Sequence, residues 1–115
     1  MKIRYSPMAR EDLHSLRSYL VGEYGAAIAD KSVRKIITDI ATLKDHPNLL
    51  RPLEDKINRP SDFRYFLCGK YSVAISLVDP NVISIVRILD GRSDYATEVF
   101  GSRTARARAT VRRMR

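Results

Sequence analysis

The spacing of apolar residues changes once along the chain, near residue 62. Before that point apolar residues recur every three to four positions, which is typical of amphipathic helices. After it they form short runs rich in β-branched and aromatic residues, which are typical of strands. The first helix, ending near residue 24, is expected to bury Ala9, Leu13, Leu16 and Leu20, and a second helix at residues 26–44 to bury Val33, Ile36, Ile37, Ile40 and Leu43.

Local signals fix the ends of these elements. Residues 1–5 alternate enough to predict a short strand, and Ser6 followed by Pro7 is typical of a helix N-cap with proline in the first turn. Gly22 and Gly25 mark the end of the first helix, and "HPNLLRP" at residues 46–52 ends the second. A joint this short between two helices predicts an antiparallel pair.

Three strands are predicted at residues 63–68, 71–78 and 82–89, in immediate succession. Gly69 and Lys70 are expected to form a two-residue hairpin loop, and residues 79–81 a turn with Pro80 in its second position. The polar stretch at residues 51–62 is predicted to be a loop, and residues 95–100 a short helical end.

These elements predict an α+β fold in the order β-α-α-β-β-β, with a helical hairpin packed on one face of an antiparallel sheet. A single hairpin covers one face of a small sheet, so the other face is expected to stay open. Ser72, Ser76 and Ser84, in otherwise apolar strands, fit a half-exposed surface.

Charge divides the chain into two parts. Of the 115 residues, 44% are hydrophobic and 30% charged, as in ordinary globular domains. Residues 1–101 hold 15 of the 21 basic residues and all 13 acidic ones, which predicts one nearly neutral domain. Residues 102–115 form an arginine-rich tail without acids, interpreted either as a solvated terminus or as a basic arm for nucleic acid. Its arginines are Arg103, Arg106, Arg108, Arg112, Arg113 and Arg115.

Several classes of protein are excluded by composition. No apolar run approaches the roughly 20 residues of a membrane helix, and the charged first residues lack the apolar segment of a secretory signal, so a cytoplasmic protein is expected. Cys68 is the single cysteine, and His14 and His46 are the two histidines. With so few soft ligands, no metal site is expected.

The chain resembles the RelE/ParE superfamily of bacterial type II toxins across residues 3–101. The resemblance is carried by "IRYSPMAREDL", "RPLEDKI", "DFRYF", "YSVAIS" and, above all, "VRILDGRSDY" at residues 86–95. It implies a compact toxin that uses no metal or organic cofactor and whose partner is a cognate acidic antitoxin. It also implies one of two targets: RelE-like members cleave mRNA on the ribosome, and ParE-like members bind DNA gyrase.

RNA cleavage needs a base, positive charge for the phosphate and a proton donor. Arg64, Arg87 and Arg92 are candidates for the phosphate, with Tyr95 as a stacking or proton-carrying group and Glu54 or Asp62 as a base. The usual histidine or lysine cluster of the ribonuclease branch is missing. We therefore predict a ParE-like gyrase inhibitor rather than an enzyme, with the ribonuclease as the alternative.

The same arginines have structural interpretations. Arg64 is equally consistent with an ion pair beside the sheet, Arg92 with a local pair to Asp94, and Tyr95 with a core anchor. Whether Arg64 and Arg87 share a face depends on the length of the loop at residues 79–81. Arg64, Arg87 and Arg92 are predicted to bind the antitoxin, on the open sheet face and beside the helical hairpin.

Overall fold

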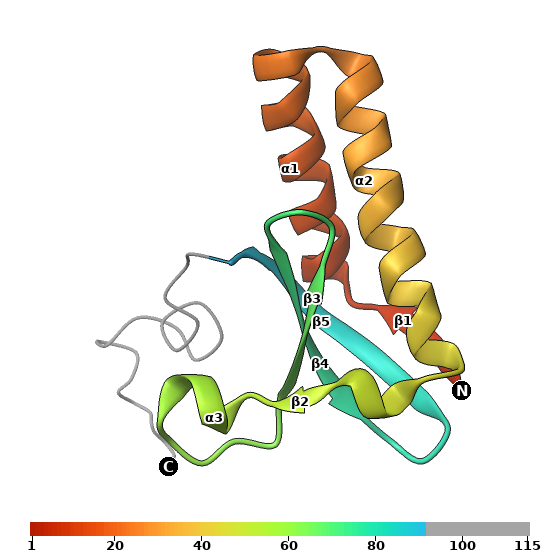
Figure 1. The fold of residues 1–115 in the computed structure, drawn as a ribbon, viewed down its shortest axis with the longest axis vertical. Coiled ribbons are helices and arrows are strands. Elements are labelled where there is room, and N and C mark those ends of the chain that lie inside the picture. Colours follow the sequence, from red (N-terminus) through yellow and green to blue (C-terminus); the bar gives the residue numbers. More distant parts are fainter. Residues whose placement is uncertain (92–115) are drawn as a thin grey trace.

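The computed structural model describes residues 1–91, which form a five-stranded sheet with a helical hairpin on one face (Figure 1). The predicted helical end at residues 95–100 and the arginine-rich tail lie outside the described residues. The α+β fold class is confirmed, with two 3₁₀ turns, a two-residue strand and a short helical turn added between the hairpin and the last three strands.

The sheet has the strand order β1-β5-β4-β3-β2. β1 (Lys2–Tyr5) is parallel to β5 (Val82–Asp90), while β5, β4 (Ser72–Val78) and β3 (Arg64–Cys68) form the predicted antiparallel meander. β2 (Arg51–Pro52) pairs with the start of β3. The first and last strands of this region of the chain therefore lie side by side.

The two predicted helices are α1 (Pro7–Tyr24) and α2 (Ala26–Ala41). Ser6 caps α1 as expected, because its hydroxyl accepts the Ala9 N–H at 3.0 Å. Gly25 joins the helices with a φ of 93°, which favours glycine. α2 ends sooner than predicted, and two 3₁₀ turns, η1 (Thr42–Lys44) and η2 (Pro47–Leu49), follow it.

The main core lies between the hairpin and the sheet. It includes Ala9 from α1, Ile36, Ile40 and Leu43 from α2 and η1, and Ala74, Ile83, Ile85 and Ile88 from the sheet. The apolar spacing predicted that Ile37 is buried, but its side chain is 44% exposed. The buried face of α2 is formed by Ala29, Ile36 and Ile40 instead. The end of the hairpin that carries the α1–α2 joint stands clear of the sheet (Figure 1).

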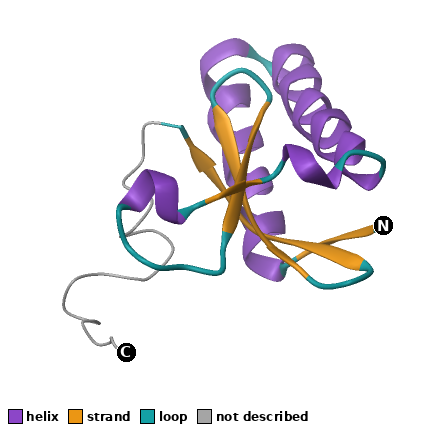
Figure 2. Ribbon diagram, turned by 60° about the horizontal axis from the view of Figure 1, so that its bottom comes forward, coloured by secondary structure: helices purple, strands orange, loops and turns teal. Residues whose placement is uncertain are grey.

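The prediction of one long loop at residues 51–62 is wrong. The segment contains β2 and a helical turn, α3 (Glu54–Ile57), on the far side of the sheet from the hairpin (Figures 1 and 2). Leu53, fully buried, anchors it in a second cluster with Val73, Ile75 and Leu89. The second sheet face is therefore partly covered rather than open.

Two details of the meander also differ from expectation. Cys68 pairs with Ser72, so the β3–β4 turn has three residues and not two. Gly69, at φ 61°, is required there because a Cβ would lie 2.7 Å from Ile36 Cγ1. Ser76 is completely buried and not half exposed, because it faces the main core.

Candidate functional site

Arg64, the first candidate, is an exposed residue at the start of β3. It is paired across the sheet with Ser76, which is in turn paired with Ile85. Its side chain helps to line an open depression of about 620 Å³ that also involves Met1, Leu50 and Asp79. Arg64 is thus accessible to a partner at this position.

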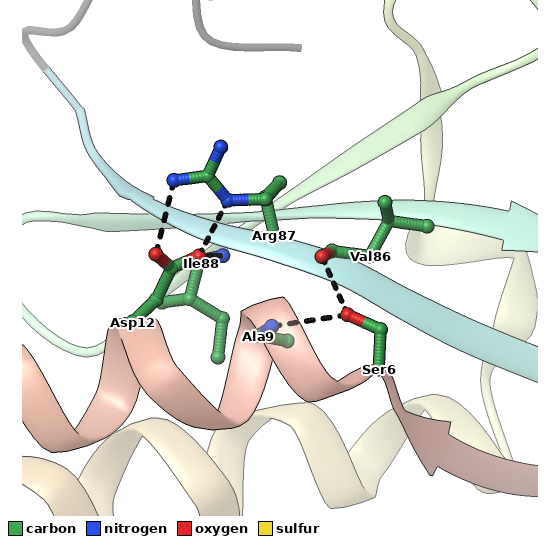
Figure 3. A network of polar contacts seen from close by, with 6 residues as sticks. All are labelled: Ser6, Ala9, Asp12, Val86, Arg87 and Ile88. Carbon is green, nitrogen blue, oxygen red and sulfur yellow. Dashed lines mark hydrogen bonds and ion pairs between the residues drawn. The ribbon is translucent and has the colours of Figure 1, made fainter.

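Arg87, the second candidate, forms an ion pair with Asp12 of α1 (Figure 3). Its Nε donates to Asp12 Oδ2 at 2.8 Å, and its Nη2 donates to Oδ1 at 3.0 Å. The two side chains are only 16% and 17% exposed. This bidentate geometry is the strong form of an arginine–carboxylate contact. The Arg87 guanidinium therefore binds Asp12 and helps to hold α1 against β5.

The two arginines belong to opposite faces of the sheet. The β4–β5 turn has two central residues, Pro80 and Asn81, since Asp79 and Val82 bond to each other across it. A bulge then shifts the register: Ser76 pairs with Ile85 but Ile75 pairs with Arg87. Because neighbouring strand residues alternate between faces, Arg87 shares a face with Ile75, and Arg64 with Ser76.

The bulge is held by the first two turns of α1 (Figure 3). The Ser6 N–H donates to Ile85 O at 2.9 Å, and the Ser6 hydroxyl donates to Val86 O at 2.7 Å. Six residues after Ser6, Asp12 Oδ2 accepts the Ile88 N–H at 2.9 Å. α1 therefore satisfies the backbone of β5 beyond the point where β1 ends.

This network was not found from the sequence. Asp12 lies in the second turn of α1, far along the chain from the strand residues that it contacts. Ala9, fully buried, lies one turn before Asp12 and lets α1 approach β5 closely. The sequence signal for this network is the occurrence of an N-cap residue, a small residue and a carboxylate at every third position, namely Ser6, Ala9 and Asp12.

The other ribonuclease candidates are dispersed or outside the described residues. Glu54 is exposed in the first turn of α3, and Asp62 is exposed in the segment before β3. Lys56, also on α3, places its Nζ 5.5 Å from the centre of the Tyr65 ring. Arg92, Tyr95 and the arginines of residues 102–115 lie outside the described residues, so their roles stay predictions.

Within the described residues, four side chains have shifted pKa values with clear causes. Burial, with a smaller effect of Asp39, raises the pKa of Cys68 to about 12, so this thiol stays protonated and unreactive at neutral pH. Burial also raises the pKa of Tyr5. A hydrogen bond from Lys35 lowers the pKa of Asp39, and one from Arg17 lowers that of Asp30.

Within residues 1–91 no group of three or more histidine, cysteine or acidic side chains is arranged to hold a metal ion. In the same part of the chain no helix has the length and apolar character needed to cross a membrane.

Comparison with known proteins identifies the fold. No curated protein matches the sequence significantly. Among solved structures, the chromosomal ParDE toxin–antitoxin system of P. aeruginosa is similar with a TM-score of 0.69 and 24% identity, covering 78% of this chain and 95% of that one. The RelBE2 toxin–antitoxin complex of Mycobacterium tuberculosis matches with a TM-score of 0.49 and 18% identity, over 77% of this chain and 95% of that one. A YafQ variant of E. coli matches with a TM-score of 0.43 and 14% identity, over 77% and 91%.

The sequence itself matches a family model over residues 3–95, a range that extends from within β1 to beyond the end of β5. That model describes the ParE toxin of type II toxin–antitoxin systems, parDE. The chain belongs to the ParE toxin family, within the predicted RelE/ParE superfamily.

Proposed function

We propose that this chain acts as a toxin that inhibits DNA gyrase by binding to it, and that a cognate antitoxin neutralises it. The observation that carries the proposal is the match of residues 3–95 to the ParE toxin family. Gyrase inhibition is the activity that the ParE-like branch implies, and it requires a binding surface rather than a catalytic centre.

The arrangement of the candidate arginines favours binding over RNA cleavage. A nuclease needs its positive charges to converge on one phosphate. Arg64 and Arg87 instead belong to opposite sheet faces, and Arg87 is held by Asp12. Moving the Arg87 guanidinium to a phosphate would leave the partly buried Asp12 carboxylate without its counter-ion, which is costly.

The projecting end of the helical hairpin is the proposed target-facing surface. Tyr19 and Tyr24 of α1 are 61% and 59% exposed, and Ile28 of α2 is 49% exposed. Exposed tyrosines are enriched among the residues that dominate binding energy in protein interfaces. Because this end stands clear of the sheet (Figure 1), it is also sterically able to enter a concave partner.

The antitoxin is proposed to contact Arg64, together with Arg92, which lies outside the described residues. Arg64 offers an exposed guanidinium beside an open depression, where an acidic side chain would form a charge-assisted hydrogen bond. Arg87 is predicted to support this interface through the α1–β5 contact.

Two assays with purified components test the activity. The full chain is added to gyrase in a supercoiling assay and to translating ribosomes in an mRNA cleavage assay. We expect supercoiling to be inhibited and the mRNA to remain intact. Cleaved mRNA with unaffected supercoiling would overturn the proposal in favour of the ribonuclease alternative.

Substitutions of exposed tyrosines test whether the end of the helical hairpin is the surface that binds gyrase. Combined Tyr19→Ala and Tyr24→Ala substitutions are expected to raise the concentration needed for half-inhibition of gyrase by about tenfold or more. Tyr71→Ala is the matched control, because Tyr71 is 66% exposed but lies in the β3–β4 turn. Equal losses for the two variants would argue against the hairpin as the target-facing surface.

A further inference from the structure

The projecting part of the helical hairpin receives little support from the sheet. In α1 the last residue that packs against the main core is Leu16, and in α2 the first is Ile36. Within the described part of the chain, no side chain between these two positions belongs to either core cluster. The arrangement of residues 17–35 therefore depends on contacts between the two helices (Figure 1).

The joint between the helices adds little rigidity at this end. Gly25 is the N-cap residue of α2, and it has no side chain to accept the free N–H groups of the first turn. Residues 26–28, the first of α2, are exposed. Ala29 is fully buried although it belongs to neither core cluster, so it marks a close approach of the helices. Its small side chain supplies little apolar area to hold them together.

An ion pair links the two helices in this region. Arg17 Nε of α1 donates to Asp30 Oδ1 of α2 at 2.7 Å. Arg34 also attracts the Asp30 carboxylate, but it lies on the same helix and cannot join α2 to α1. The Arg17 and Asp30 side chains are 45% and 47% exposed, so their pair contributes little to the stability of the whole fold. Its effect is expected on the local position of α1 relative to α2, which few other contacts hold.

We propose that Arg17 and Asp30 are positioning residues, which hold the target-facing surface of the hairpin in the arrangement that binds gyrase. Tyr19 and Tyr24 belong to α1 and Ile28 belongs to α2, so this surface depends on how the two helices are placed. A partner that binds one arrangement loses apparent affinity in proportion to the fraction of chains that leave it. The inference rests on the proposed function, because it concerns the surface assigned there to gyrase.

Removal of either charge is expected to weaken inhibition while the chain stays folded. Asp30→Asn keeps the size of the side chain, and it should raise the concentration needed for half-inhibition of gyrase supercoiling about two- to fivefold, as a single exposed ion pair permits. Arg17→Gln should give the same change. Lys35→Gln is the matched control, because the Lys35–Asp39 pair that it removes lies within α2 and links no second helix. This control should inhibit gyrase as strongly as the original chain.

Exchange of the two charges separates positioning from direct contact with gyrase. The double variant Arg17→Asp with Asp30→Arg restores an ion pair between the helices, with its ends reversed. Inhibition is expected to return to within about twofold of that of the original chain. A double variant at least as weak as the single variants would show that these side chains contact gyrase themselves, and would overturn the positioning role.

Hydrogen exchange measured by NMR reports the arrangement of the helices without gyrase. In the Asp30→Asn variant, the amides of Leu20 in α1 and Val33 in α2 are expected to exchange about two- to fivefold faster than in the original chain. The Ile85 amide, in β5, is the internal control and should keep its rate. Urea denaturation of the same samples shows whether the variants remain folded.

The outcomes separate the inference from the function. Full inhibition by Asp30→Asn, or an equal loss in Lys35→Gln, would overturn the inference and leave gyrase inhibition intact. Unchanged exchange at Leu20 and Val33 would also overturn it, because the ion pair would then not hold the helices. Absence of inhibition by the original chain would reject the proposed function and, with it, the role assigned to the pair.

Discussion

Removing the carboxylate of Asp12 is expected to destabilise the whole fold. Asp12 accepts two hydrogen bonds from Arg87 and one from the backbone of Ile88, with donor–acceptor distances of 2.8, 3.0 and 2.9 Å. Asp12→Ala would leave a mostly buried guanidinium without its counter-ion and a strand N–H without its acceptor. Both losses are confined to the folded state, because water solvates these groups in the unfolded chain.

The magnitude follows from the contacts that are lost. Breaking a fully buried ion pair by removing one partner costs about 3–5 kcal/mol. The Asp12–Arg87 pair retains some solvent access, at 17% and 16% exposure, so we expect a loss of about 2–4 kcal/mol in the free energy of unfolding. Asp12→Ala combined with Arg87→Ala is expected to be less destabilised than the sum of the single variants, because no charge is then left unmatched.

Urea denaturation followed by circular dichroism measures these free energies. Asp30→Ala is the control, since Asp30 forms an ion pair with Arg17 in which both side chains are nearly half exposed. Its unfolding midpoint should stay close to that of the original chain. A midpoint for Asp12→Ala as little shifted as that of the control, or strictly additive effects at Asp12 and Arg87, would refute the assigned role of the pair.

Three further experiments address other parts of the chain. Gly69→Ala is expected to lower the free energy of unfolding by about 1–2 kcal/mol, because it strains a positive φ and meets Ile36; an unchanged urea midpoint would contradict the close approach. The raised pKa of Cys68 and its burial predict that the native thiol does not react with a colorimetric disulfide reagent near pH 8, whereas the chain in denaturant reacts at once; rapid native labelling would count against this. Deleting residues 102–115 should abolish any steeply salt-dependent binding to nucleic acid and spare the gyrase assay, and unchanged nucleic-acid affinity would reject the basic-arm interpretation.

The sequence predicted the layers and order of the fold because its local signals were strong. Ser6-Pro7 located the start of α1, and the change in apolar spacing separated the helices from the strands. The toxin family was likewise predicted from the sequence, and the most specific of the segments that indicated it includes Arg87. These signals act within a few residues, where periodicity and capping are decisive.

Long-range detail could not be predicted in the same way. The bulge beside Val86 reverses the alternation of β5, and nothing in the apolar spacing marks it. Asp12 is 75 residues from Arg87, so their pairing depends on how α1 docks. Leu53 looked like part of a polar loop, yet its burial brings α3 onto the second sheet face. Each of these features is set by packing between distant segments rather than by propensity.

The parallel pairing of β1 with β5 has a consequence for synthesis of the chain. Ser6 and Val86 are 80 residues apart, and Asp12 and Ile88 are 76 apart. The helical hairpin can form early from local contacts, but β1 has no neighbour in the sheet until β5 has left the ribosome. A nascent chain that stops before residue 82 therefore lacks both the strand that holds its N-terminus and the backbone that Asp12 caps. Production of a folded toxin is tied in this way to completion of the last strand, and prematurely terminated chains are left without the assembled sheet.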